Sequence, residues 1–445
     1  MTRELVAGDI TLSEGGARAT LSCRVEARGG SRPAGLPETL WVETPRELAP
    51  GILVGGDAFL PVLLLVAMRH EIPRLVIEGD VSALLLASSR RIAEIYQRWS
   101  LDMGRPLGLA EVKAAGAAER PRGSSGSAAF FSAGVDSFYT LLRNARRYPR
   151  DDDRAITHLL AVGGFDIPLE DEALFGQLVA AGHDVAREMG RTLVPIRTNA
   201  RDMLREVDWY HFGFGPALAA VALALGGAFH TVYIPSGRSI LEPFSAAASH
   251  PGVDPLWSTE GLELVHDGCD TPRVDKVPLV AASDLALRHL RVCWENRGGR
   301  YNCGRCEKCV RTKVMLALHG ALARATTLPG RIEPEDLERA PRSAPERWRR
   351  LVEEIRARAG AAVEWLPVVD AVEAGLARAS WDSSLLGRMD GTVSRWLRRA
   401  GVTASRLDAL DVRLLGGRGG RIYRRFQRRT PGARSGRSPG TGSGV

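Results

Sequence analysis

A short run of small residues between an apolar stretch and a helix start is the first place in this chain where chemistry is expected. The apolar stretch 128–131 has the character of a buried strand, and a helix signal follows at Asp136. The residues that form the turn and the start of the helix, together with Asp136, are Ser132, Ala133, Gly134, Val135 and Ser137. The first N–H groups of a helix lack partners and the helix dipole adds partial positive charge, so this turn can hold a phosphate. An ordinary strand–turn–helix corner is the alternative.

Asp136 carries more information than the small residues around it. A carboxylate beside a phosphate is repulsive unless a divalent cation lies between the two groups. The turn and Asp136 together therefore predict a phosphate group bound with a divalent cation. The turn is not a Walker loop, because the tripeptide Gly-Lys-Ser/Thr occurs nowhere in the sequence.

Four cysteines form the second group with recognisable chemistry, and they are Cys293, Cys303, Cys306 and Cys309. Four thiolates fill a tetrahedral zinc site and leave no open position, which is typical of structural rather than catalytic zinc. An iron–sulfur cluster is the alternative, since four cysteines also hold such clusters. Disulfides are not expected, because nothing else in the sequence marks the chain as secreted.

The two groups, in this order and at this separation, resemble one superfamily of enzymes. Ser-Ala-Gly-Val-Asp-Ser at 132–137 is similar to the Ser-Gly-Gly-x-Asp-Ser loop of the PP-loop ATP pyrophosphatases, with Ala133 in place of the second glycine. The cysteine spacing, and the segment 271–276 that ends in a lysine, resemble the 7-cyano-7-deazaguanine synthases of that superfamily. The resemblance covers about residues 125–316. Alanine at position 133 is tolerable where the backbone has a negative φ.

This resemblance implies an α/β PP-loop fold and a reaction that cleaves ATP between its α- and β-phosphates. Asp136 would face Mg²⁺, and Arg273 and Lys276 would stabilise the departing pyrophosphate. The acceptor would be a carboxylate or amide, which ammonia or an amine attacks after adenylation. Besides the turn, the residues implied for holding ATP are Gly164, Phe165, Asn199, Ser236 and Gly237. The stretch 236–258 departs from the deazapurine-binding stretch of those synthases, so the acceptor is left open.

Two other functions fit the same motifs. One is an enzyme with the same ATP chemistry that modifies tRNA, and the other is a zinc-stabilised module that binds nucleotides without turnover. RNA binding beyond a basic tail would favour the first of these, and a near-neutral body argues against it. Release of AMP and pyrophosphate distinguishes an enzyme from a binding module.

Composition and charge set the broad class of the protein. Of 445 residues, 44% are hydrophobic and 25% charged, as in globular proteins, and no signal peptide or membrane span is expected. A cytoplasmic location is expected in consequence. The net charge is +8, but nine arginines and no acidic residue follow position 412, so the rest of the chain is close to neutral. That tail predicts at most a weak contact with nucleic acid.

Alternating strand and helix patterns from residue 127 onward are expected to position these groups. This order predicts a parallel sheet with helices on both faces, and ligands at the carboxyl ends of its strands. Strands are predicted over 128–131, 158–162, 192–196 and 231–235, with a helix ending at Arg146 and others over 171–189 and 215–225. The segment 234–292 is expected to be a long pocket-forming loop.

Three histidines are candidates for substrate contact or proton transfer. His211 lies in an aromatic loop, and His250 and His266 lie in the long segment. A packed structural role is the alternative for each.

The chain is expected to divide into four parts. The first is an α+β accessory domain, with a possible role in homo-oligomer formation, and the second is the PP-loop domain with its zinc knuckle. A helical segment follows, and then a basic tail with too little apolar surface to fold. The predicted bounds are 1–124, 125–322, 323–415 and 416–445. Within the first part, strands are predicted at 20–26, 39–43 and 75–78, and helices at 56–70 and 84–99.

Overall fold

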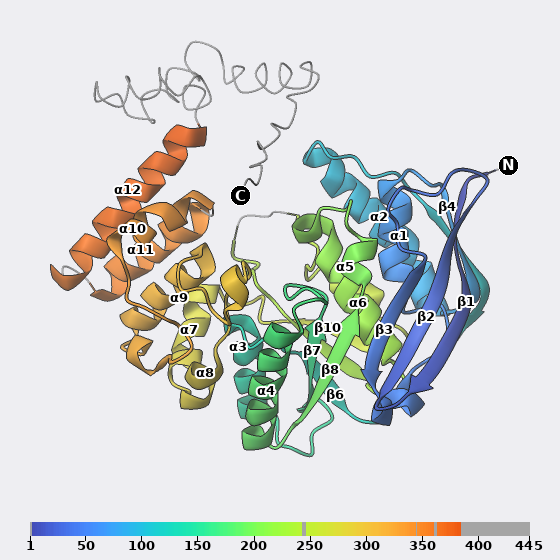
Figure 1. The fold of residues 1–445 in the computed structure, drawn as a ribbon, viewed down its shortest axis with the longest axis horizontal. Helices are drawn as coiled ribbons and strands as arrows, with labels where there is room; N and C mark the ends of the chain where they lie inside the picture. Colours follow the sequence, from blue (N-terminus) through green and yellow to red (C-terminus); the bar gives the residue numbers. More distant parts are fainter. Residues whose placement is uncertain (1, 243–245, 344, 360–362, 384–445) are drawn as a thin grey trace, which may run out of the picture. The chain divides into compact units, whose positions relative to one another are not determined.

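The computed structural model describes residues 2–242, 246–343, 345–359 and 363–383. The chain divides into two compact units, residues 1–331 and residues 332–445. The first unit is built on one sheet of ten strands, and the second is helical in its described part (Figure 1).

The sheet of the first unit is mostly parallel and has the strand order β10-β9-β6-β7-β8-β3-β2-β1-β4-β5. Only the pairs β1–β2, β2–β3 and β3–β8 are antiparallel. Its strands are β1 (Glu4–Gly15), β2 (Arg18–Arg28), β3 (Thr39–Pro45), β4 (Arg74–Ser82), β5 (Glu111–Ala118), β6 (Ser127–Phe130), β7 (Ile156–Gly163), β8 (Thr192–Thr198), β9 (Thr231–Pro235) and β10 (Glu263–Asp267).

The five strands from β6 to β10 are all parallel to one another, which confirms the predicted α/β class. The chain runs from β6 outward through β7 to β8, then crosses to the other side of β6 for β9 and β10. Neighbouring crossovers therefore leave on opposite faces beside β6, which makes the carboxyl ends of β6 and β9 the topological switch point of the sheet. All four residues of β6 are buried, as expected of a central parallel strand.

Helices cover both faces of this parallel half, as right-handed crossovers require. In Figure 1, α3 and α4 lie on one side of these strands and α6 lies on the other. The helices of the first unit are α1 (Leu60–Arg69), α2 (Ala83–Asp102), α3 (Val135–Arg147), α4 (Glu172–Met189), α5 (Ala200–Met203), α6 (Phe214–Ala224), α7 (Arg273–Ala281), α8 (Asp284–His289) and α9 (Glu307–Leu318).

The segment 234–292 is not the long loop that the sequence pattern predicted. It contains β10, α7 and α8, together with a short 3₁₀ turn, η3 (Asp254–Trp257). β10 has only five residues and α7 has a proline, Pro278, inside it, so neither shows a clear periodic pattern. Pairing of β10 with β9 and packing of α7 against α3 give this segment its structure.

The amino-terminal strands extend the same sheet rather than forming a separate one. β3 pairs with β8 through Val42 opposite Thr198 and Glu43 opposite Arg197. The predicted strands and helices of this part are present, and β1 and β5, which were not predicted, are added to them. The predicted boundary at residue 124 thus falls inside one compact unit, between two strands of one sheet.

The second unit contains three helices among its described residues, α10 (Pro334–Arg339), α11 (Pro345–Ala359) and α12 (Leu366–Ser383). Trp348, Leu351, Val352 and Ile355 of α11 are buried, which is the spacing of one helix face. No helix in the described part of the chain is long and apolar enough to cross a membrane. The predicted basic tail, 416–445, lies outside the described residues.

Candidate functional site

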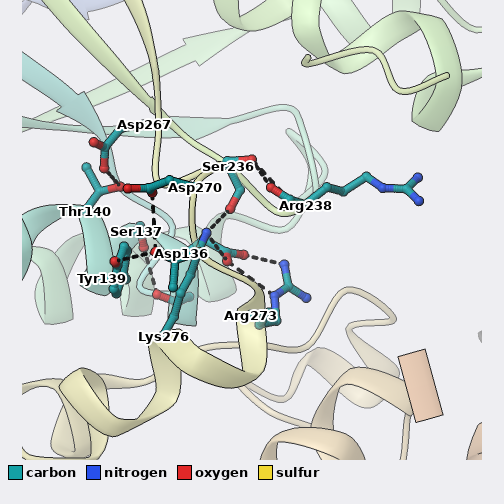
Figure 2. Close-up of polar contacts among 12 residues, drawn as sticks. Asp136, Ser137, Tyr139, Thr140, Ser236, Arg238, Asp267, Asp270, Arg273 and Lys276 are labelled. Atoms are coloured by element: carbon teal, nitrogen blue, oxygen red, sulfur yellow. Dashed lines mark hydrogen bonds and ion pairs between the residues drawn. The ribbon is translucent and has the colours of Figure 1, made fainter. Parts of the chain in front are cut away.

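Charged side chains from distant parts of the sequence meet at the carboxyl ends of β6 and β9. Asp136 stands in the first turn of α3, directly after β6, and the turn Ser236–Arg238 follows β9. Arg273 and Lys276 extend from α7 toward Asp136 (Figure 2). The three residues predicted for catalysis are therefore together, at the switch point of the sheet where ligands bind in open α/β folds.

Asp136 is held between the two cations. Its carboxylate forms an ion pair with Arg273, whose Nε lies 3.3 Å from Oδ1, and Lys276 Nζ lies 3.4 Å from the same oxygen. Lys276 also donates to the main-chain oxygen of Ser236 at 2.6 Å. The three ionised side chains sum to one positive charge, which leaves the site suited to an anion.

Burial and mutual attraction decide how these groups ionise. Desolvation raises the pKa of Asp136, but Arg273 and Lys276 outweigh it and hold that pKa below its usual value. Desolvation likewise lowers the pKa of Lys276, whose side chain is 1% exposed, and the neighbouring Asp136 only partly restores it. For Arg273, the attraction of Asp136 exceeds the cost of burial and raises the pKa. Asp136 is thus a carboxylate and Arg273 a cation at neutral pH.

Three polar contacts fasten α3 to the segment that carries α7. Tyr139 donates its hydroxyl to Thr271 Oγ1 at 3.0 Å, and Thr140 donates to Asp267 Oδ2 at 2.6 Å. Arg143 binds both oxygens of Asp270 at 2.8 Å. The Tyr139 ring also lies under Lys276 Nζ, 5.3 Å from the ring centroid. Sequence reasoning missed these residues, although their polar spacing along α3 was a usable signal.

The turn between β6 and α3 has a left-handed residue that is not glycine. Ala133 has φ +56°, so the condition under which alanine was expected to be tolerable here is not met. Its carbonyl accepts the Arg291 N–H at 2.8 Å, which ties the turn to the segment before the cysteines. Left-handed backbone is unfavourable for alanine because Cβ crowds the carbonyl oxygen, so the turn is strained next to the charged cluster.

Replacing Ala133 with glycine is expected to stabilise the protein by about 1 kcal/mol, because glycine adopts this backbone without strain. Thermal denaturation measures the change. Ala180→Gly, at an exposed position inside α4, is the matched control and should destabilise by about 1 kcal/mol. An Ala133→Gly variant that loses stability as Ala180→Gly does would show that the turn is not strained.

The residues implied for adenosine lie at the carboxyl ends of β7 and β8. Gly164 has φ +95°, and a Cβ there would lie 2.0 Å from the Thr198 oxygen, so only glycine fits. The Phe165 ring packs on Trp209 at 5.4 Å. The side-chain amide of Asn199 binds the backbone of β3: its oxygen accepts from Trp41 N and its nitrogen donates to Thr39 O. Its side chain therefore joins two parts of the sheet.

The four cysteines form one compact buried group, the four-cysteine cluster of Cys293, Cys303, Cys306 and Cys309. Their sulfur atoms all lie within 4.8 Å of one another, and none is in a disulfide. Cys293 Sγ and Cys306 Sγ are 3.9 Å apart, close to the roughly 3.8 Å expected between thiolates around a tetrahedral zinc at about 2.3 Å. The Cys306 N–H points to Cys303 Sγ at 3.3 Å. The cluster could hold a metal ion such as zinc.

Asn302 holds the backbone that carries this cluster, and sequence reasoning missed it. Its buried side-chain oxygen accepts from Val292 N at 2.9 Å and Cys293 N at 3.2 Å. Its amide nitrogen donates to Leu290 O and Thr327 O. All four hydrogen-bonding positions of one amide are thus used, and they join three stretches of chain around the cluster.

Asn302→Asp is expected to destabilise the protein by roughly 1–3 kcal/mol, because a carboxylate oxygen would face two carbonyl oxygens and leave them unpaired. Chemical denaturation measures this, and metal content after dialysis against a chelator measures the affinity of the cluster. Asn144→Asp is the control, since Asn144 also bridges backbone groups but lies away from the cysteines. Both variants should lose stability, and only Asn302→Asp should lose metal. Equal metal retention would contradict the role of Asn302 in the cluster.

Only one of the three candidate histidines reaches the charged site. His211 Nδ1 lies 2.9 Å from Asp208 in a single π-helical turn, η2 (Trp209–Gly213), and the His250 ring packs against Trp99. His266 Nε2 lies 2.8 Å from Ser236 Oγ, in the residue whose carbonyl holds Lys276.

The site thus combines a helix start, one carboxylate, a buried lysine and a half-buried arginine at a sheet switch point. The Asp136 carboxylate could serve as the one protein ligand of a bound Mg²⁺, because this ion is usually held by one or two carboxylates together with substrate phosphates. Comparisons of the chain with protein families, with curated proteins and with solved structures found no match.

Proposed function

We propose that this protein is an ATP-dependent adenylating enzyme of the PP-loop type, which cleaves ATP to AMP and pyrophosphate and joins a carboxylate or amide to ammonia or an amine. The observation that supports it most is the meeting of Asp136, Arg273 and Lys276 beside the first turn of α3. Fixed positive charge next to free helix N–H groups suits a polyphosphate whose leaving group gains charge.

Each residue of the site has a role in this proposal. The N–H groups of the 132–137 turn and the start of α3 bind phosphate oxygens, and Asp136 turns from its cations to hold Mg²⁺, which neutralises phosphate charge. Arg273 and Lys276, released from Asp136, then face the β-phosphate. Lys276 keeps its contact with Ser236 O at 2.6 Å and so approaches the phosphate from a fixed direction. The cations need no large movement, because they already border the same carboxylate.

The reaction proceeds in two balanced steps. An oxygen of the acceptor attacks the α-phosphorus, and the bond from that phosphorus to the bridging oxygen breaks, so pyrophosphate leaves with the electron pair. The nitrogen of ammonia or an amine then attacks the adenylated carbon, the bond from that carbon to the phosphate oxygen breaks, AMP leaves with the electron pair, and the nitrogen gives up a proton to solvent. Arg273 and Lys276 act in the first step, where negative charge accumulates on the leaving pyrophosphate. The four-cysteine cluster, with zinc bound, supports the 132–137 turn through Arg291 N and Ala133 O.

Pyrophosphate and AMP release test the proposal. Purified protein is incubated with MgATP, ammonia and a panel of small carboxylic acids, beside Lys276→Met and the control Lys113→Ala, which removes an exposed lysine of β5. The proposal expects acceptor-dependent release that Lys276→Met lowers by about 10³-fold and Lys113→Ala leaves unchanged. Release only with tRNA would move the acceptor to RNA. ATP binding without release under any acceptor would favour the binding module.

A further inference from the structure

A second polar network lies directly behind the Ser236 turn. His266 Nδ1 is 2.7 Å from Asp254 Oδ2, and His266 Nε2 is 2.8 Å from Ser236 Oγ. Ser249 donates its hydroxyl to the same Asp254 oxygen at 2.6 Å, and His250 N donates to the other at 3.2 Å. The network is buried, with side-chain exposures of 4% for His266 and 0% for Asp254.

The order carboxylate, imidazole, hydroxyl is that of a serine nucleophile, but the proton of Ser236 is already used. Ser236 Oγ donates to Arg238 O at 2.6 Å, and a hydroxyl has only one proton to give. Two oxygens at that distance without a proton between them would repel each other. His266 Nε2 must therefore donate to Ser236, and a second proton lies between His266 Nδ1 and Asp254. The His266–Asp254 pair holds two protons and is neutral overall.

The groups around this pair agree with that assignment. Burial, followed by the charge of His266, lowers the pKa of His250, so the nearest other histidine is kept neutral. Tyr96, on α2, has its pKa raised by burial and by Asp254 and stays a neutral phenol. Arg238 is the remaining charged residue of the turn, and its main-chain N–H donates to Ser236 Oγ at 3.3 Å. Asp254 is thus the only carboxylate in contact with His266 among the described residues.

We propose that His266 is a positioning residue: its doubly protonated ring, held by Asp254, fixes the Ser236–Arg238 turn and so aims Lys276 at the bound anion. Ser236 connects His266 to Lys276, since its Oγ accepts from His266 and its main-chain oxygen accepts from Lys276. The aim at an anion rests on the proposed function, whereas the protonation and the link to Lys276 do not.

Nitrogen NMR tests the protonation directly in the full-length protein. With ¹⁵N-labelled histidine, the signal that disappears in His266→Gln is assigned to His266 among nine histidines. Both ring nitrogens are expected to be protonated at neutral pH. One protonated and one bare nitrogen would overturn the proposal, whatever the protein does with ATP.

The link to Lys276 has its own readout. The chain has four lysines, so ¹⁵Nζ-lysine labelling resolves Lys276, and its signal is expected to shift in His266→Asn. His266→Gln should restore it in part, because a glutamine amide can donate to Ser236 from the Nε2 position. His230→Gln, a buried histidine at the other end of β9, is the control that should leave the signal in place. An unmoved Lys276 signal in His266→Asn would overturn the positioning role.

Binding of inorganic pyrophosphate with Mg²⁺, measured by calorimetry, completes the test. Affinity is expected to fall about 10-fold in His266→Asn and to recover in His266→Gln, because a misaligned charged donor loses its hydrogen bond. If wild-type protein binds no pyrophosphate, the proposed function fails while the two NMR readouts still decide the role of His266. Equal affinity of all variants would contradict the aim of Lys276 at the anion.

Discussion

Cys306→Ser is expected to release zinc from the four-cysteine cluster and to cost the protein more stability than any single change elsewhere. Structural zinc in small domains supplies about 10–16 kcal/mol of binding free energy, which is as large as the whole stability of many domains. The cluster also supports the strained turn at Ala133, through the contact of Arg291 N with Ala133 O. Zinc content by mass spectrometry and the denaturation midpoint, measured together, should fall together.

The matched control for this change is Cys269→Ser, which removes a thiol outside the cluster. It should keep the zinc and lower the midpoint only slightly. A Cys306→Ser protein that retains zinc but is inactive would point to a redox or nucleophilic role for the cysteines. Iron and sulfide in the purified wild-type protein would replace zinc with an iron–sulfur cluster.

Asp136→Ala is expected to abolish turnover, by about 10³-fold or more, in a protein that still folds. The carboxylate is the protein ligand proposed for Mg²⁺, and nothing else among the described residues takes its place between Arg273 and Lys276. The protein is expected to fold because Lys276 keeps its contact with Ser236 O. A buried lysine that has lost its carboxylate partner can also become neutral by losing a proton. Steady-state AMP release and the thermal midpoint measure the two effects separately.

Metal-free pyrophosphate gives this prediction a second, sharper outcome. Removal of Asp136 takes away the counter-charge of Arg273 and Lys276, so pyrophosphate should bind at least as tightly without Mg²⁺ as it does to wild-type protein. The Lys276 pKa is already lowered by burial and should fall further without Asp136. As the pH rises, the variant should therefore lose the Lys276 charge, and with it affinity for pyrophosphate, at a lower pH than the wild type does. Asp153→Ala, at an exposed position paired with Arg122, is the control. Full turnover in Asp136→Ala would remove the carboxylate from the mechanism.

Local patterns predicted the secondary structure of the parallel half because its strands and helices are long or strongly apolar. The strands at 128–131, 158–162, 192–196 and 231–235 are confirmed with small shifts at their ends. The four cysteines were expected to gather, and they do, because close spacing in the chain limits how far apart they can lie. The left-handed Ala133 was not predicted, since the strain is imposed by the contacts of the turn and not by its residue types.

The sequence by itself therefore determined the α/β class, the position of the turn before α3 and the clustering of the cysteines, all of which depend on residues near one another along the chain. The tertiary structure alone decided that α7 carries Arg273 and Lys276 to Asp136, more than 130 residues earlier, and that β3 pairs with β8. It also decided that Asp254 and Ser236 enclose His266. Such contacts depend on which faces pack together once the sheet has formed, and residue types along one stretch of chain do not specify their distant partners.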